Sequence, residues 1–115
     1  MRFLLAAVLT AILIAHANAQ TALGTITGTV TDPQQAPAAN VEIQARNSGT
    51  AIIYRATTND SGTYVIPNLP VGAYEVTAKG AGFKQVRRTG VTVEVSQRLR
   101  LDIELQLGDV AERVD

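Results

Sequence analysis

Apolar and polar residues alternate along most of this chain, and this period of two constrains the fold more than any other feature. The stretch from Arg98 to Leu107 shows it best, because five aliphatic side chains alternate there with five charged or amide side chains. Successive side chains of a β-strand point to opposite faces, so one face of this stretch is apolar and the other polar. A helix would spread the same leucines around its circumference. The pattern therefore predicts a half-buried strand.

Six shorter stretches follow related patterns and are separated by segments rich in Pro, Gly, Asn and Asp. In two of them we expect three alternate residues to share an inward face: Tyr74, Val76 and Ala78, and Val91, Val93 and Val95. The other four span residues 25–31, 41–46, 51–58 and 64–66, and the inward face of 51–58 is ambiguous. Seven strands at short spacing, each with one polar face, predict a seven-stranded antiparallel β-sandwich.

The N-terminal segment has the pattern of an export signal. Arg2 is the only charged residue before Asp32, and residues 3–15 are uncharged and almost all apolar. As a helix this run would reach about 20 Å, short of the roughly 30 Å hydrocarbon core of a bilayer. Ala17-Asn18-Ala19 fits a small-x-small cleavage site. We expect a signal peptide over residues 1–19, cleaved between Ala19 and Gln20, and no transmembrane helix in the mature chain; the alternative is a buried N-terminal helix.

Cleavage there restricts the chemistry. Of 115 residues, 96 remain, and they include no His or Cys, because His16 is the only histidine and the chain has no cysteine. This excludes imidazole bases, Ser-His-Asp and Cys-His nucleophile systems, and metal sites built on His or Cys. Nine basic and ten acidic residues remain, so no excess positive charge favours nucleic acid. The sequence predicts no catalytic residue, no bound metal, no cofactor and no nucleic-acid partner.

Two polar groups allow a functional and a structural interpretation. Asp102 and Glu104 share a strand face as a glycosidase pair would, but they alternate with arginines, which favours a solvated charged face. The segment Asn59-Asp60-Ser61-Gly62 holds one carboxylate. A calcium loop needs about six to eight oxygen ligands, so a turn capped by side chains, with positive φ at Gly62, is favoured.

Lys84, Arg87 and Arg88 form a small basic group after Phe83. We expect a charged edge strand that discourages pairing with other sheets. The alternative is docking to an acidic partner or a lipid headgroup.

Sugar binding would require exposed aromatic rings. The alternation turns Tyr64 and Tyr74 inward, and Phe83 is expected to close one end of the sandwich. This leaves Tyr54, which lies beside Arg55. Tyr54 and Arg55 are therefore the candidate ligand contacts, with a polysaccharide as the candidate ligand.

Three stretches, taken in order, resemble the carboxypeptidase regulatory-like domain family. They read GTITGTVTDPQQAPAANVEIQARNSGT, TTNDSGTYVIPNLPVGAYEVTAKGAGF and VTVEVSQRLRLDIELQLG. The most specific motif is Asn-Leu-Pro-x-Gly-x-Tyr followed by Gly-Phe, and the resemblance covers residues 25–108. It implies a transthyretin-like (prealbumin-like), carbohydrate-binding-like Greek-key sandwich that serves as a non-catalytic accessory domain.

A signal peptide followed directly by this domain is similar to the N-terminus of Oar-type TonB-dependent outer-membrane receptors. We expect a signal peptide over 1–19, the sandwich over 20–108, and a tail or the start of a linker over 109–115. The resemblance implies an exported protein, at the periplasm and outer membrane or outside the cell, that contacts a protein partner or neighbouring domain. The alternatives are a carbohydrate-binding module and an accessory domain of a secreted peptidase. Whether the chain is a fragment or stands alone is left open.

Overall fold

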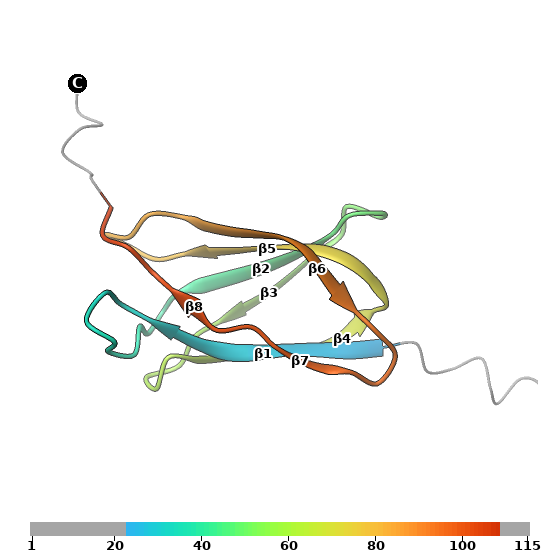
Figure 1. Cartoon of the computed structure of the whole chain (residues 1–115), viewed down its shortest axis with the longest axis horizontal. Coiled ribbons are helices and arrows are strands. Elements are labelled where there is room, and N and C mark those ends of the chain that lie inside the picture. The colour runs from blue at the N-terminus through green and yellow to red at the C-terminus, as the bar shows by residue number, and fades with distance from the viewer. Residues whose placement is uncertain (1–22, 109–115) are drawn as a thin grey trace, which may run out of the picture.

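The computed structural model describes residues 23–108, which form two β-sheets packed face to face (Figure 1). The first sheet has the order β4 (Thr63–Pro70), β1 (Leu23–Thr31) and β7 (Arg98–Arg100), and β8 (Ile103–Glu104) also pairs with β1. The second has the order β3 (Ile53–Thr57), β2 (Glu42–Asn47), β5 (Gly72–Lys79) and β6 (Val86–Val93). The described residues contain no helix, and thus none capable of spanning a bilayer. The predicted β-sandwich is confirmed.

The core lies between the two sheets and consists of the inward members of the alternating pattern. Burial of aliphatic and aromatic surface is the main favourable term in folding, at roughly 25 cal/mol per Å². Both sheets contribute fully buried side chains; the largest are Tyr64, Tyr74, Ile26, Ile43, Ile66, Leu69, Ile103 and Leu105. The predicted inward face of Tyr74, Val76 and Ala78 is confirmed, since all three are fully buried.

Two residues that the alternation places inside are exposed. Val95 is 55% exposed because it lies in the tight turn between β6 and β7, where Gln97 N–H donates to the Glu94 carbonyl. Leu107 is 67% exposed because it lies beyond β8, near the last described residue, where only an isolated bridge to Phe83 continues the pairing. The inward faces of both stretches are therefore shorter than the sequence predicts.

The closing stretch differs from the prediction in its direction and its continuity. It runs parallel to β1, with Thr25, Ile26 and Thr27 beside Arg98, Leu99 and Arg100, whereas every other strand pair is antiparallel. It is also divided into β7 and β8 by an irregular step at Leu101 and Asp102, so the described residues form eight strands. Side-chain alternation identifies the buried face of a strand but carries no information about the direction of its neighbour.

Strand β4 continues through Pro67 to Pro70, although the prediction ended it before Pro67. Strand β4 lies at the edge of its sheet and pairs only with β1. Proline is tolerated at an edge because the N–H it lacks is not needed for the ladder.

The predicted turn at Asn59, capped by its side chain, is present, and Asn47 caps a second turn in the same way. Asn47 Oδ1 accepts from the backbone N–H groups of Gly49 and Thr50 at 2.9 and 3.0 Å. Asn59 Oδ1 accepts from Ser61 and Thr63, both at 3.0 Å. Gly62 has a φ of 72°, and a Cβ there would lie 2.6 Å from the Val30 carbonyl oxygen, so the turn requires glycine on both counts.

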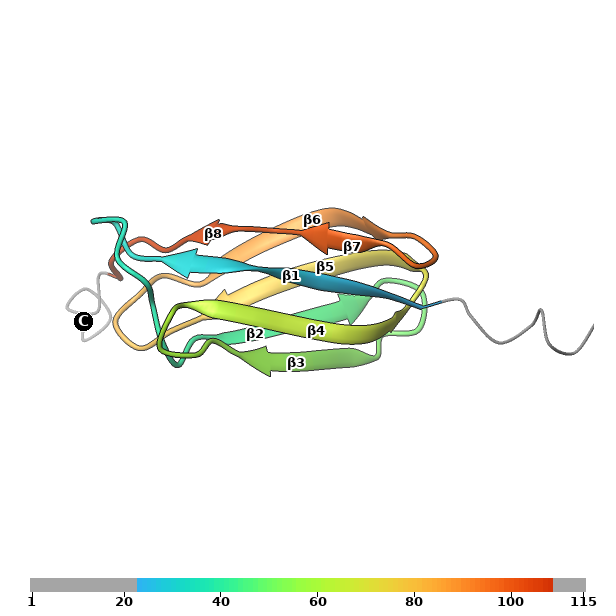
Figure 2. The ribbon, with the colours of Figure 1, turned by 90° about the horizontal axis from the view of Figure 1, so that it is seen from below.

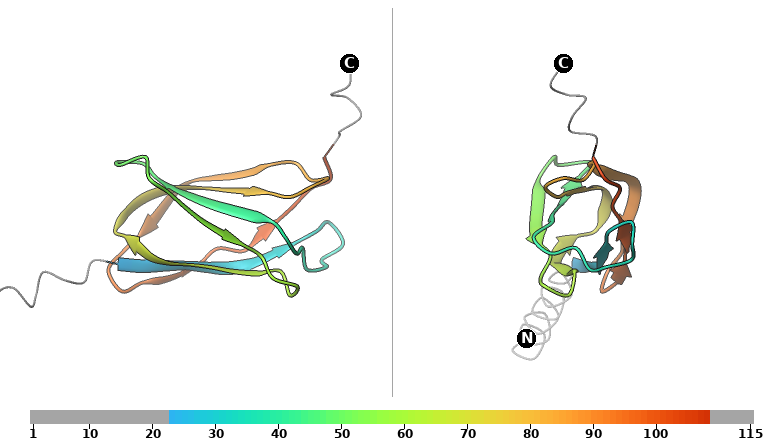
Figure 3. Two further views of the ribbon diagram at one scale, coloured as in Figure 1. Left: turned by 180° about the vertical axis from the view of Figure 1, so that it is seen from behind. Right: turned by 90° about the vertical axis from the view of Figure 1, so that its left-hand side faces the viewer.

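The described chain begins and ends at opposite ends of the sandwich, as Figures 2 and 3 show. The start of β1 lies at the same end as the turn between β6 and β7. Residue 108 lies at the other end, close to Phe83. The first and last described residues are therefore separated along the long direction of the sheets.

Candidate functional site

The most extensive group of polar contacts lies beside β1, at the step between β7 and β8. Gly28 permits a close approach there, because a Cβ on it would lie only 2.0 Å from the Leu101 carbonyl oxygen. The Tyr64 hydroxyl donates to that same carbonyl at 2.5 Å. The carbonyl is thus held against the middle of β1, and the next residue, Asp102, points outward.

The Asp102 carboxylate replaces a main-chain acceptor at this step. Its Oδ1 accepts from the Thr29 backbone N–H at 2.9 Å and from the Thr29 hydroxyl at 3.2 Å. Arg100 Nε donates to Asp102 Oδ2 at 3.0 Å. These bonds, that from the Thr29 backbone first, hold the pKa of Asp102 below its ordinary value despite an opposing effect of partial burial. Asp102 is therefore a permanently ionised structural group at neutral pH.

The neighbouring phenol is also unsuited to proton transfer. Burial, with a smaller contribution from the negative charge of Asp102, raises the pKa of Tyr64 far above its ordinary value. Tyr64 is 2% exposed and its hydroxyl is engaged by Leu101. A general acid or base needs a pKa near the working pH and access to substrate.

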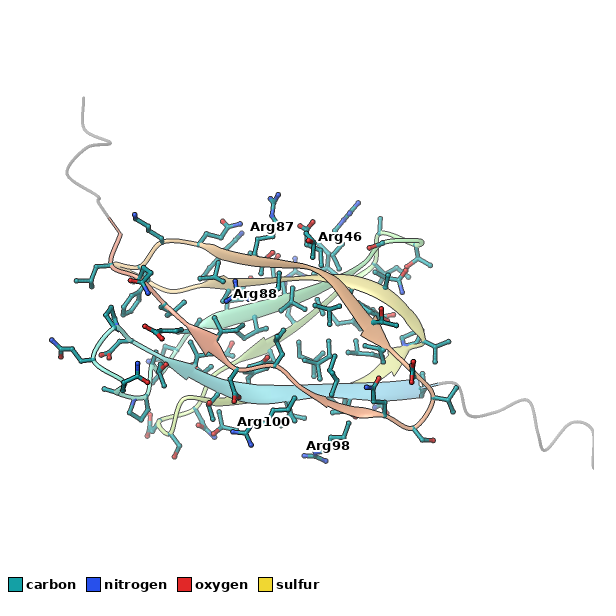
Figure 4. The ribbon with its side chains drawn as sticks, viewed as in Figure 1. Arg46, Arg87, Arg88, Arg98 and Arg100 are labelled. Atoms are coloured by element: carbon teal, nitrogen blue, oxygen red, sulfur yellow. The ribbon has the colours of Figure 1, made fainter. Side chains whose placement is uncertain are left out.

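The carboxylates Asp102 and Glu104 do lie on the outer face of their sheet with Arg98 and Arg100, as predicted. Figure 4 shows the two arginines on this side of the molecule. An inverting or retaining glycosidase needs one carboxyl group with a raised pKa, whereas the pKa of Asp102 is lowered. This face fits a solvated surface, in agreement with the favoured interpretation.

Two open hollows indent this outer face on either side of Asp102. One, of about 220 Å³, is lined by Thr27, Gly28, Thr29, Thr63 and Arg100. The other, of about 330 Å³, is lined by Thr29, Thr31, Gln35, Asp102, Ile103 and Glu104. Small-molecule sites are mainly apolar and bury most of their ligand. These hollows are open and are lined mainly by polar residues, and Arg100 and Asp102 already bond to each other, so they do not have the character of such a site.

Tyr54 and Arg55, the candidate ligand contacts, point to opposite faces of β3. The Tyr54 ring packs against the core, with its centroid 6.3 Å from that of Tyr74 in an edge-to-face arrangement. Arg55 lies on the outer face, 59% exposed, with its Nε 3.9 Å from Glu42 Oε1. The Tyr54 ring is therefore partly buried rather than free at the surface, because β3 turns its even-numbered residues inward, and its role as a ligand contact stays a prediction. The two side chains do not form one contact surface.

The basic residues of β6 also divide between two faces. Arg87 lies on the outer side of the sheet, where Figure 4 shows it near Arg46, and its Nε is 3.4 Å from Glu75 Oε1. Arg88 lies opposite the inward-facing Val76. Both are exposed on the edge strand of the sheet, as predicted. They do not converge on one anion site.

Metal-binding groups do not gather in the part of the chain that the structure describes. Residues 23–108 bring no three His, Cys, Asp or Glu side chains together. In the Asn59 turn the amide oxygen is occupied by two backbone N–H groups. This turn is held by its own hydrogen bonds.

The geometry defines a two-layer β-sandwich module whose polar groups serve its own fold, and comparison with known proteins assigns the family. The sequence profile of the carboxypeptidase regulatory-like domain matches residues 25–106, and the chain belongs to this family. It is 34% identical over 94 residues to the TonB-dependent transporter Oar of Myxococcus xanthus. That match covers 78% of this chain and 9% of Oar, so the chain corresponds to a small part of that relative.

Solved structures show how widely the fold is used. The TIE protein of Bacillus anthracis superposes with a TM-score of 0.63 at 18% identity, covering 75% of this chain and 17% of that protein. Catechol 1,2-dioxygenase from Pseudomonas arvilla superposes with a TM-score of 0.62 at 11% identity, covering 78% of this chain and 54% of the enzyme. At such identities the likeness concerns the fold alone, and the fold does not determine activity.

Proposed function

We propose that this chain is a non-catalytic, extracytoplasmic interaction and spacer domain, the N-terminal module of a TonB-dependent outer-membrane receptor. The observation that carries the proposal is the 34% identity to the Oar transporter over 94 residues. Membership of the carboxypeptidase regulatory-like family supports a non-catalytic role, and the match covers only 9% of Oar, as expected of one module in a longer protein.

The chemistry of the described residues agrees with such a role. Asp102 and Tyr64 are held by structural hydrogen bonds and have pKa values displaced away from neutrality. The remaining charged groups lie on exposed faces. A protein built in this way acts through its surface rather than through a reacting centre.

The proposed domain organisation agrees with the sequence pattern. Residues 1–19 are a signal peptide cleaved between Ala19 and Gln20, residues 20–108 are the sandwich, and residues 109–115 are a tail or the start of a linker. The two ends of the described chain lie at opposite ends of the sandwich, which suits a spacer that separates the segments attached at its two ends.

The gene itself tests this proposal. We expect the reading frame to continue beyond codon 115 into a plug and a β-barrel, and N-terminal sequencing of the envelope protein to begin at Gln20. A stop codon after Asp115, together with a product found free in the medium, would contradict the receptor role and favour a stand-alone module.

A further inference from the structure

Two sheets of this kind present four edge strands, and their free backbone groups determine where another strand could add. In an antiparallel pair, residues whose N–H and C=O point toward the neighbour alternate with residues whose groups point away. Asn47 N–H donates to the Ile52 carbonyl at 2.9 Å, and Thr58 N–H donates to the Val41 carbonyl at 3.0 Å. The even-numbered residues of β3 therefore face β2, and Ile53, Arg55 and Thr57 point their backbone groups outward.

These three residues define what we call the β3 edge. Strand β3 pairs with β2 alone. Within residues 23–108, no backbone bond from a loop or another strand reaches Ile53, Arg55 or Thr57. The β3 edge thus offers three N–H donors and three C=O acceptors in one regular strand of five residues.

Strand β4, the edge of the other sheet beside β3, is closed to addition. Up to Ile66 its register with β1 turns the odd-numbered residues outward, because Val30 N–H donates to the Gly62 carbonyl at 2.7 Å; the register shifts before Leu69. Thr63 is already engaged by Asn59, whose backbone N–H donates to the Thr63 carbonyl and whose side chain accepts from the Thr63 N–H, both at 3.0 Å. Pro67 has no N–H. Only Val65 between them has both outward backbone groups available.

The two edges on the opposite side are interrupted. Strand β6 shifts register between Tyr74 and Val76 of its partner, beside Gly90 with a φ of 69°. The closing strand is broken at Asp102 into β7 and β8. Bulges, charges and broken strands are the means by which proteins protect sheet edges from pairing. The β3 edge has neither a bulge nor a break, and its one charged side chain is Arg55.

The surroundings of the β3 edge add apolar surface at one end and charge in the middle. Ile52 and Ile53, at the start of the strand, are 52% and 37% exposed. Arg55, at the centre, is only loosely paired with Glu42 at 3.9 Å. An incoming strand would therefore meet an aliphatic side chain and a cation on the same face, two residues apart.

The central arginine selects the kind of occupant. Antiparallel pairing of two copies that used all three residues would place Arg55 opposite Arg55, and like charges directly opposite each other destabilise a sheet. An acidic residue at that position would instead form a cross-strand ion pair. We propose that the β3 edge binds one extended segment of a different polypeptide, with Asp or Glu opposite Arg55 and a β-branched aliphatic residue opposite Ile53. This inference rests on the proposed role as an interaction module and specifies its partner.

A synthetic peptide tests the proposal directly. The probe is acetyl-Ser-Thr-Val-Glu-Val-Ile-Ser-amide, which in antiparallel register places its glutamate opposite Arg55 and its isoleucine opposite Ile53. The full gene is expressed, and the exported, ¹⁵N-labelled protein is titrated and followed by amide chemical shifts and hydrogen exchange. We expect the largest shifts along β3, and slowed exchange of the Ile53, Arg55 and Thr57 amides.

Charge reversal provides the matched control. A peptide with lysine in place of glutamate should bind about fivefold more weakly, because a cross-strand charge pair is worth up to about 1 kcal/mol. Arg55→Glu should invert this preference. Arg98→Glu, an equal change on the other sheet, should leave both affinities unchanged.

Backbone methylation separates edge pairing from other contacts without altering the protein. Methylating the glutamate nitrogen of the peptide removes a donor that faces β3 and should abolish binding, whereas methylating a valine nitrogen, which faces away, should not. Equal effects of the two methylations, shifts centred on another strand, or no shifts at millimolar peptide would overturn the proposal. So would a dimer in sedimentation velocity that is lost on Thr57→Pro, since the occupant would then be a second copy.

This outcome is independent of the gene's continuation. Peptide binding with a stop codon after Asp115 would retain the β3 edge and discard the receptor assignment. A reading frame that continues into a β-barrel, without peptide binding, would retain the receptor assignment and discard the β3 edge as a binding site.

Discussion

At the residue scale, the Asp102 carboxylate stands in for a main-chain carbonyl beside β1. The Leu101 carbonyl is drawn toward Gly28 and Tyr64, so the ladder has no backbone acceptor for the Thr29 N–H, and Asp102 Oδ1 accepts it at 2.9 Å. The carboxylate Asp102, which could look catalytic in the sequence, thus supplies a hydrogen-bond acceptor that the backbone of the sheet lacks at this point. This assignment makes Asp102 and Gly28 the residues at which small changes are most informative.

Asp102→Ala should lower the free energy of unfolding by about 0.5–1 kcal/mol, because Thr29 loses an acceptor that water replaces only in part at this half-exposed site. Asp102→Asn should cost less, since it retains an acceptor oxygen. Urea unfolding at neutral pH measures both. Equal stability of the alanine variant and the wild type would show that the carboxylate has no role in the ladder.

The stabilisation by Asp102 should depend on pH in a defined direction. The pKa of Asp102 is lowered in the folded protein from an ordinary value of 3.8, so its contribution is complete above that value and is lost as the pH falls through the lower folded pKa. The difference in unfolding free energy between wild type and Asp102→Asn should therefore be constant from pH 7 to about 5 and shrink below about pH 4. A difference that grows on acidification would contradict the lowered pKa.

Gly28→Ala should destabilise by about 1–3 kcal/mol, since its Cβ would collide with the Leu101 carbonyl oxygen at 2.0 Å and force the closing strand away. Gly49→Ala is the control, because its Cβ meets nothing closer than 3.4 Å. Thermal unfolding compares them. A wild-type melting temperature for Gly28→Ala would mean that the two strands do not approach this closely.

At the element scale, the closing stretch shows where the alternating pattern stops describing the structure. Ile103 and Leu107 have the same parity, but Ile103 is 2% exposed and Leu107 is 67% exposed. The difference arises because Ile103 pairs with Val30 inside the sandwich, whereas Leu107 lies beyond the last strand.

Ile103→Ala should therefore cost about 2–5 kcal/mol, as buried aliphatic truncations do. Leu107→Ala should change stability by less than about 0.5 kcal/mol. Chemical denaturation of both variants is the measurement. Similar losses at the two positions would mean that the closing stretch is buried along its whole length.

The sequence could predict which face of each strand is buried much better than it could predict which strands pair with each other. The inward-facing residues of β1, β2 and β5 follow from the period of two, because whether a side chain is buried depends on its own position along the strand. The parallel pairing of β7 with β1 involves residues more than 70 positions apart, and no local pattern encodes it. Tyr54 could not be placed because its stretch is apolar on both sides. The glycine in the middle of β1 was the one local sign of the close approach beside Asp102.

At the scale of the whole molecule, two features suit this sandwich to a role as a module: one sheet edge is open, and the described chain begins and ends far apart. Three of its four edge strands are blocked by proline, a bulge or a broken ladder, and the β3 edge is open. The described chain starts and finishes at opposite ends, so the module can hold that edge away from the rest of a larger protein.

The size and cellular location of the polypeptide that carries this domain decide whether it is the module of an outer-membrane receptor. An antibody against residues 23–108 would be used on fractionated cells, and the reactive band would then be sequenced from its N-terminus. We expect an outer-membrane protein several times longer than 115 residues that begins at Gln20. A cytosolic protein that retains Met1, or a band that hydrolyses substrate on its own, would contradict this expectation.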